Sequence, residues 1–146
     1  MTSFENLCRK TLFIEGEVYN LHKEAKKLCK LRINFYIKDK ILFIRPIGYM
    51  DQETVNGLRG KLIEIIEENH IKDIIFNMKE LSFMDSTGIG IIIGRYNQIK
   101  MKGGKIVMCE LNEITNKLYY LTGLSRIISL AETEKDAYNF LKDNGE

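Results

Sequence analysis

Apolar segments of two kinds alternate along most of this chain, and their order is what most constrains the fold. From residue 33 onward, short runs rich in Ile, Val and Phe alternate with longer segments whose apolar residues recur every three or four positions. These are the patterns of strands and of amphipathic helices. The expected order is two strands, three helix–strand pairs and a final helix, which predicts an α/β fold with a mostly parallel sheet of four to five strands covered by helices.

Turn residues and helix-end residues set the expected boundaries of these elements. The first two strands lie within 33–45 as a hairpin around Asp39-Lys40, and Pro46 and Gly48 are expected to stop the second strand. Asp51 is the expected N-cap of the helix that follows. The further elements are expected to be strands at 72–78, 105–111 and 126–131 and helices at 51–69, 87–102, 113–123 and 134–144.

The length and composition of the chain indicate one domain preceded by a short extension. Its 146 residues are 45% hydrophobic and 29% charged, an ordinary globular composition. Residues 16–31 carry apolar residues every three or four positions, which predicts a further amphipathic helix. We therefore predict an N-terminal extension at 1–32, containing this helix, and a domain at 33–146.

Charge is distributed unevenly between the extension and the domain. Residues 1–45 hold ten Lys or Arg against five Asp or Glu, whereas residues 46–146 hold twelve against fifteen, a net charge of −3. A nucleic-acid-binding domain needs a concentrated basic face, so the domain is not expected to bind nucleic acid directly. The alternatives for the basic helix at 16–31 are contact with a membrane, a nucleic acid or a sensory partner, and simple packing on the domain.

Cysteine and histidine residues are too sparse and too scattered for a metal site or a disulfide framework. Cys8, Cys29 and Cys109 lie far apart, as do His22 and His70. Residues 1–15 lack the continuous apolar core of a signal peptide, and no run approaches the length of a membrane span. We expect a cytoplasmic protein with no metal, no cofactor and no membrane span.

The segment "LSFMDSTGIGIIIGRY", residues 81–96, places a polar tetrad between two apolar stretches. The expected loop at 81–88 leaves the carboxyl end of the strand at 72–78, where sites of parallel sheets collect. Ser86 could be the N-cap of the following helix, or a hydroxyl that a partner protein reads and modifies. Gly88, Gly90 and Gly94 are expected to let that helix lie close to the sheet.

Motifs of catalysis and of phosphate binding do not fit this segment. The sequence around Ser86 is M-D-S-T-G, whereas a hydrolase elbow requires G-x-S-x-G. The segment "NGLRGKL" fails the spacing of a phosphate-binding loop, and "GIGIIIG" lies within an apolar helix instead of opening one. An enzyme is therefore not expected, and a small hydrolase or nucleotide-using enzyme built on Ser86 is kept as the enzyme-class alternative.

Residues 80–109, "ELSFMDSTGIGIIIGRYNQIKMKGGKIVMC", resemble the central block of the anti-sigma-factor antagonists, which are single STAS domains of Gram-positive bacteria. "GRYNQIK" with "GGKIVMC" resembles the sporulation sigma F branch more than the general-stress branch. "LTGLSRIISL", residues 121–130, is similar to the family's segment before its last helix. The resemblance covers about residues 36–141.

The resemblance implies a regulatory switch that is not an enzyme. Ser86 would be phosphorylated by an anti-sigma factor that is also a serine kinase, and the unphosphorylated protein would bind this kinase and release its sigma factor. A PP2C-type phosphatase would reset the switch, and the free protein would be a monomer. The residues expected to bind the partner are Asp51, Asp85, Ser86, Thr87 and Gly88.

The turn before the first helix of the domain departs from the family pattern. "GYMD", residues 48–51, stands where the family has a "GELD"-like turn. Asp51 matches the acidic residue, but Tyr49 replaces a charged one, so partner contacts there are expected to differ. The second binding-class alternative is a STAS scaffold in a different signalling assembly.

Overall fold

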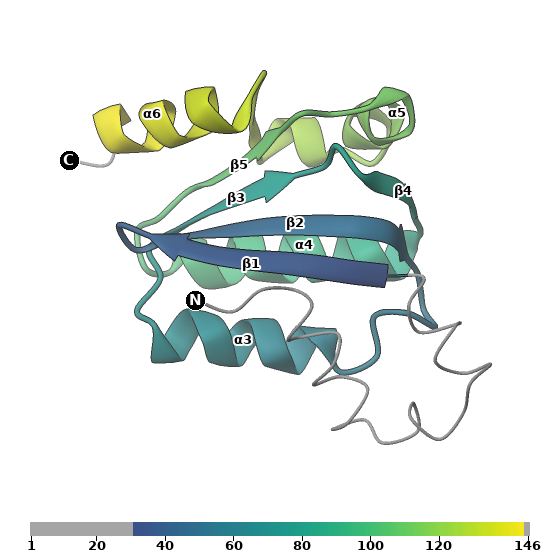
Figure 1. Cartoon of the computed structure of the whole chain (residues 1–146), viewed down its shortest axis with the longest axis horizontal. Coiled ribbons are helices and arrows are strands. Elements are labelled where there is room, and N and C mark those ends of the chain that lie inside the picture. Colours follow the sequence, from purple (N-terminus) through teal and green to yellow (C-terminus); the bar gives the residue numbers. More distant parts are fainter. Residues whose placement is uncertain (1–30, 145–146) are drawn as a thin grey trace.

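A mixed six-stranded sheet with helices on both faces forms the part of the chain that the computed structural model describes, residues 31–144 (Figure 1). The α/β class and the mostly parallel sheet are confirmed. The extension predicted at 1–32 lies almost wholly outside the described residues. The strands are β1 (Leu31–Lys38), β2 (Ile41–Met50), β3 (Asp73–Asn77), β4 (Leu81–Met84), β5 (Ile106–Cys109) and β6 (Ser129–Ala131). The helices are α3 (Leu58–Glu68), α4 (Ser86–Lys100), α5 (Glu113–Leu121), the 3₁₀ turn η1 (Leu124–Arg126) and α6 (Glu134–Asn144).

The hairpin of β1 and β2 forms where the sequence predicts it. Asp39 and Lys40 both have positive φ, at 54° and 64°, as the two central residues of a tight hairpin turn require. The expectation that Pro46 and Gly48 stop β2 is wrong, because β2 runs on to Met50. On the side away from β1, β2 pairs with β3 through Ile44 and with β4 from Gly48 onward. Pro46 lies between these two paired stretches, so its missing N–H removes no hydrogen bond from the sheet.

Three further boundaries differ from expectation. The strand expected at 126–131 begins only at Ser129, because the chain first forms the 3₁₀ turn η1. The expected loop at 81–88 contains the strand β4, which pairs with β2 in parallel and adds a strand to the predicted sheet. The helix expected at 51–69 begins only at Leu58, because residues 51–57 form a series of turns. Gly57, in the left-handed region at φ 80°, separates those turns from α3.

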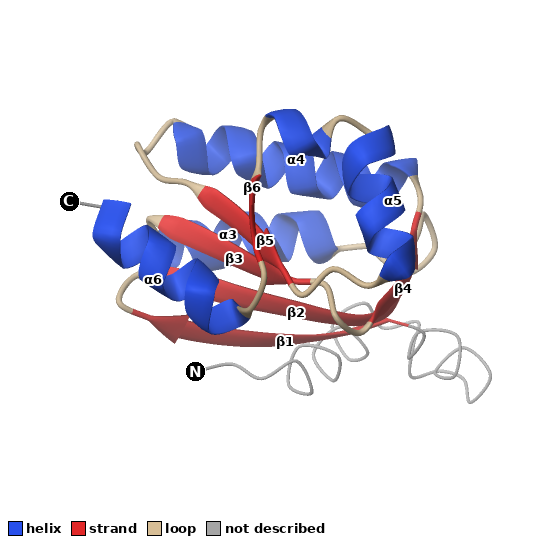
Figure 2. Ribbon diagram, turned by 90° about the horizontal axis from the view of Figure 1, so that it is seen from above, coloured by secondary structure: helices blue, strands red, loops and turns tan. Residues whose placement is uncertain are grey.

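The sheet order is β1-β2-β3-β5-β6, with β4 beside the end of β2. All pairs are parallel except the β1–β2 hairpin. One face packs against α3, α4 and α5 in a core whose largest fully buried side chains include Phe76, Leu62 and Ile66. The opposite face packs against α6 through Ala137 and Leu141. Figure 2 shows α4 and α6 on opposite sides of the strands.

An ion pair fixes α6 to the sheet. Arg45 on β2 donates two hydrogen bonds to Glu134, at 2.8 and 2.6 Å, and Asn77 on β3 donates a third at 2.9 Å. Burial alone would raise the pKa of Glu134, but these bonds outweigh it and hold the pKa below its ordinary value. None of the helices between residues 31 and 144 is long and apolar enough to cross a membrane.

Candidate functional site

The five predicted partner-binding residues come together at one edge of the sheet. β2 and β4 run in parallel, and their last residues, Met50 and Met84, are paired. Asp51 and Asp85 each follow one of these residues, so the turn after β2 and the start of α4 lie side by side. The backbone N–H of Asp85 also donates to the carbonyl of Met50 at 3.1 Å.

Asp85 links the turn after β2 to the start of α4, and it caps α4. Its Oδ1 accepts from the N–H groups of Thr87 and Gly88, at 2.9 and 3.2 Å, while its Oδ2 accepts from the N–H of Gln52 at 3.2 Å. Asp85 is therefore the N-cap, and the prediction that Ser86 could be the N-cap is wrong. Because Asp85 holds the N-cap position with its own carboxylate, Ser86 is left as the first residue of the helix.

Asp51 shapes the turn that follows β2 and does not cap a helix. Its Oδ1 accepts from the N–H groups of Glu53 and Thr54, at 3.0 and 2.9 Å. Thr54 is buried, accepts from the N–H of Asp51 and donates to the carbonyl of Tyr49 at 2.7 Å. The expectation of a helix N-cap at Asp51 is wrong because Asn56 and Gly57 still separate this turn from α3.

Removing the two carboxylates should have unequal effects on stability. We expect Asp85→Ala to lower the free energy of unfolding by about 2 kcal/mol and Asp51→Ala by about 1 kcal/mol. Asp85 bonds to both segments, whereas Asp51 bonds only within its own turn. Urea unfolding of the two variants gives the comparison, and an equal loss would mean that the bond from Gln52 to Asp85 adds nothing.

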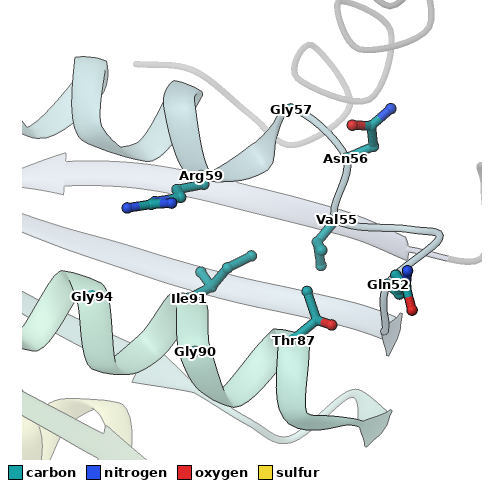
Figure 3. A pocket seen from close by; sticks show the side chains of 9 residues that line it. All are labelled: Gln52, Val55, Asn56, Gly57, Arg59, Thr87, Gly90, Ile91 and Gly94. Carbon is teal, nitrogen blue, oxygen red and sulfur yellow. The ribbon is translucent and has the colours of Figure 1, made fainter.

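Ser86 has the exposure that a modifiable hydroxyl needs. Its side chain is exposed and makes no hydrogen bond to any residue between 31 and 144. Thr87, the next residue, is half-buried and lines a groove between α3 and α4 (Figure 3). The structure therefore presents Ser86, and not Thr87, as the more accessible hydroxyl of the tetrad.

Gly88 has a structural role in this site. A Cβ at Gly88 would lie 2.8 Å from the carbonyl oxygen of Met50 and 3.0 Å from the Cβ of Met84. Only glycine allows α4 to start this close to the ends of β2 and β4. The similar expectation for Gly90 and Gly94 is wrong, because a Cβ at either position would meet nothing within 4 Å.

An exposed aromatic pair near the ends of β2 and β4 adds a feature of which the sequence indicated only Tyr49. Tyr49 and Phe83 are 46% and 42% exposed, and their ring centroids lie 6.4 Å apart across β2 and β4. The sequence marked Tyr49 as a departure from the family but gave no reason to choose Phe83, because β4 was read as a loop. Exposed aromatic side chains of this kind are common anchors of protein–protein contacts.

In residues 31–144, no histidine is placed beside Ser86 as a general base. His70 follows the carboxyl end of α3, on the order of 16 Å along that helix from the end near Ser86. Burial raises the pKa of Cys109 to about 12, so this thiol stays protonated and unreactive. No group of three His, Cys, Asp or Glu that could hold a metal occurs in residues 31–144.

Comparison with known proteins identifies the family to which this α/β fold belongs. The profile of the STAS domain matches residues 32–137. The chain belongs to the STAS domain family. Among relatives of this STAS domain, an anti-sigma F factor antagonist of Paenibacillus polymyxa is 33% identical over 102 residues, covering 70% of this chain and 87% of the relative. An anti-sigma-B factor antagonist of Bacillus subtilis (strain 168) is 33% identical over 103 residues, covering 69% and 93%.

Solved structures of one antagonist share the fold. SpoIIAA in its unphosphorylated form is 26% identical and superposes with a TM-score of 0.68, covering 76% of this chain and 96% of that one. The phosphorylated form of the Bacillus cell fate determinant SpoIIAA gives a TM-score of 0.61 at 26% identity, covering 75% and 98%. These relatives are regulatory proteins and not enzymes.

Proposed function

We propose that this STAS domain is an anti-sigma-factor antagonist controlled by phosphorylation of Ser86. The unphosphorylated form binds an anti-sigma factor that is also a serine kinase, and the sigma factor is released. Phosphorylation of Ser86 ends this binding, and a PP2C-type phosphatase restores it. The observation that carries the proposal is the exposed, unbonded hydroxyl of Ser86 at the first position of α4. It agrees with the existence of SpoIIAA in unphosphorylated and phosphorylated forms.

The position of Ser86 makes a phosphoryl group compatible with the fold. A phosphoserine carries close to two negative charges near pH 7. At the amino end of α4 these charges are favoured by the helix dipole and by nearby N–H groups. The Ser86 side chain already points to solvent, so the added group needs no space inside the domain. Its charge would therefore act on a bound partner more than on the domain.

The proposed contact surface consists of exposed and half-buried groups at the ends of β2 and β4 and the start of α4. Asp51 uses Oδ1 within its turn, and its Oδ2 accepts no hydrogen bond from the described residues, so it can receive a cationic side chain of the partner. Tyr49 and Phe83 supply apolar contact area. Asp85 and Gly88 contribute by shaping the loop that presents Ser86 and Thr87.

The charge of Asp51 can be tested apart from its structural role. Asp51→Asn keeps an oxygen that can accept from Glu53 and Thr54 but removes the negative charge. We expect the affinity for the anti-sigma factor to fall about tenfold, as for the loss of a charged contact, with the melting temperature nearly unchanged. Calorimetric titration and thermal unfolding measure the two quantities. An unchanged affinity would leave Asp51 with only the structural role.

Identification of the modified residue tests the proposed switch. The protein is incubated with the anti-sigma factor and ATP and is then digested for mass spectrometry. We expect the phosphate on Ser86, and we expect Ser86→Ala to remain unmodified. Thr87→Val serves as the control for the site of modification, and its phosphate should still be found on Ser86. Phosphate on Thr87 in the wild-type protein would contradict the assignment.

The identity of the sigma factor is a separate question. The relatives named for sigma F and for sigma B are both 33% identical to this chain, so identity does not favour either. The segment "GRYNQIK" with "GGKIVMC" favours a sigma factor of the sporulation type. Parallel titrations with anti-sigma factors of the two types distinguish these partners.

A further inference from the structure

We propose that Asn112, at the start of α5, is a positioning residue that fixes where the hydroxyl of Ser86 lies for phosphoryl transfer. The inference rests on the function proposed above for Ser86. The side chain of Asn112 bonds to the turn that leads into β4 and to Thr115, so it acts on Ser86 through β4. Figures 1 and 2 show α5 next to β4, on which it packs.

The side-chain amide of Asn112 binds three backbone carbonyls of the turn between β3 and β4. Its Nδ2 donates to the carbonyls of Met78, Lys79 and Leu81, at 3.1, 3.1 and 2.8 Å. An amide nitrogen has two hydrogens, so both are used and one of them is shared between two acceptors. One side chain therefore sets the path of the backbone over residues 78–81.

The first turn of α5 fixes the orientation of this amide. Oδ1 of Asn112 accepts from the N–H of Thr115 at 2.9 Å, and the N–H of Asn112 donates to Oγ1 of Thr115 at 2.8 Å. These reciprocal bonds form a capping box, and Thr115 is buried. Because Oδ1 faces the helix, Nδ2 must face the turn before β4. The helix therefore holds the donor group in place.

The strand that Asn112 holds is short and has one paired neighbour. β4 is four residues long, and among the strands of residues 31–144 it pairs with β2 alone. The pairing covers three residues of each strand, and its register shifts between Gly48 and Tyr49. Two strands paired over so short a length are weakly held. The bonds from Asn112 therefore supply a second anchor for β4.

The position of β4 determines the position of Ser86. Met84 ends the strand, and Asp85 and Ser86 follow it directly. The start of α4 lies so close to Met50 and Met84 that Gly88 has no room for a Cβ, so a shift of β4 is passed to the first turn of α4. An error of about 1 Å in the place of a reacting group can lower a rate by about a hundredfold. Asn112 can therefore control phosphorylation without contacting the hydroxyl.

Substitution of Asn112 in the full-length chain separates the cap of α5 from the link to β4. In Asn112→Asp the carboxylate keeps an oxygen for the N–H of Thr115 and suits a helix start. It has no hydrogen to donate, and it faces three carbonyl oxygens. We expect kcat for phosphorylation of Ser86 by the anti-sigma factor to fall about tenfold, with KM nearly unchanged. Asn112→Ser keeps a capping oxygen without the added charge and should lower kcat in the same way.

The matched control is Tyr119→Phe on the same helix. Tyr119 is buried and donates to the carbonyl of Ile128, so its substitution removes a bond of α5 that does not involve β4. We expect a lower melting temperature with kcat as in the wild type. A loss of stability alone lowers the folded fraction of the substrate, which raises the apparent KM and leaves kcat at saturation unchanged.

Hydrogen exchange of backbone amides tests the link to the loop without any phosphorylation. The N–H groups of Gln52, Thr87 and Gly88 all donate to the carboxylate of Asp85. When β4 is less firmly held, these bonds should open more often. We expect the three amides to exchange about tenfold faster in Asn112→Asp than in the wild type and to keep the wild-type rates in the control variant.

Two results would overturn the positioning role. The first is an unchanged kcat in both Asn112 variants, and the second is an equal loss of kcat in Tyr119→Phe. If wild-type Ser86 takes no phosphate, the function proposed above fails, and hydrogen exchange then decides on Asn112 alone. Faster exchange of the loop in Asn112→Asp than in Tyr119→Phe supports the link through β4, and equal exchange contradicts it.

Discussion

Phosphorylation of Ser86 should lower the affinity for the anti-sigma factor by more than about tenfold, or 1.4 kcal/mol, and leave the melting temperature nearly unchanged. The hydroxyl is exposed at the first position of α4, where the helix dipole favours a negative group. The same charge pressed against a partner surface loses its water and repels acidic groups there. Calorimetric titration and thermal unfolding of the two forms give both quantities on the same samples.

Two substitutions separate the charge of the phosphate from its size. Ser86→Ala cannot be charged and should bind the anti-sigma factor as tightly as the unphosphorylated wild type. Ser86→Asp brings one negative charge, less than a phosphate does, and should bind with intermediate affinity. If the affinity falls only in step with the melting temperature, the charge disrupts the domain and does not act at the interface.

Substitution of Gly88 should have the largest effect on stability among changes at the site. Gly88→Ala places a Cβ 2.8 Å from the carbonyl oxygen of Met50 and 3.0 Å from the Cβ of Met84. The start of α4 must then move away from β2 and β4, which we expect to cost about 3 kcal/mol of unfolding free energy. Urea unfolding measures this loss.

The matched control for Gly88 is Gly90 on the same helix. Gly90→Ala adds a Cβ in open space and should stabilise the protein by up to about 1 kcal/mol through the higher helix propensity of alanine. Similar effects of the two substitutions would mean that the close approach of α4 to β2 is not what requires glycine at position 88.

The alternation of strands and helices was enough to predict the α/β fold, because each apolar run has a clear period. The hairpin could be predicted locally, because Asp39 and Lys40 separate two strand-like runs. In the structure both residues have the positive φ of a tight turn. β4 was not predictable in this way. It is four residues long, lies between polar turns and gains its strand character from pairing with the end of β2.

The location of the site could be predicted from the sequence, whereas its N-cap and its aromatic contacts could not. The tetrad at Asp85–Gly88 identified the location, but the assignment of the N-cap to Asp85 depends on hydrogen bonds to Thr87, Gly88 and Gln52. The contribution of Phe83 follows from the pairing of β4 with β2.

Release of a sigma factor tests the switch at Ser86 most directly. The sigma factor is held by its anti-sigma factor, and its release is followed over time after addition of this protein with ATP. With wild-type protein, the amount of free sigma factor should fall as phosphate accumulates on Ser86. With Ser86→Ala, it should stay high throughout. Equal time courses for the two proteins, with phosphate present on wild-type Ser86, would contradict the switch.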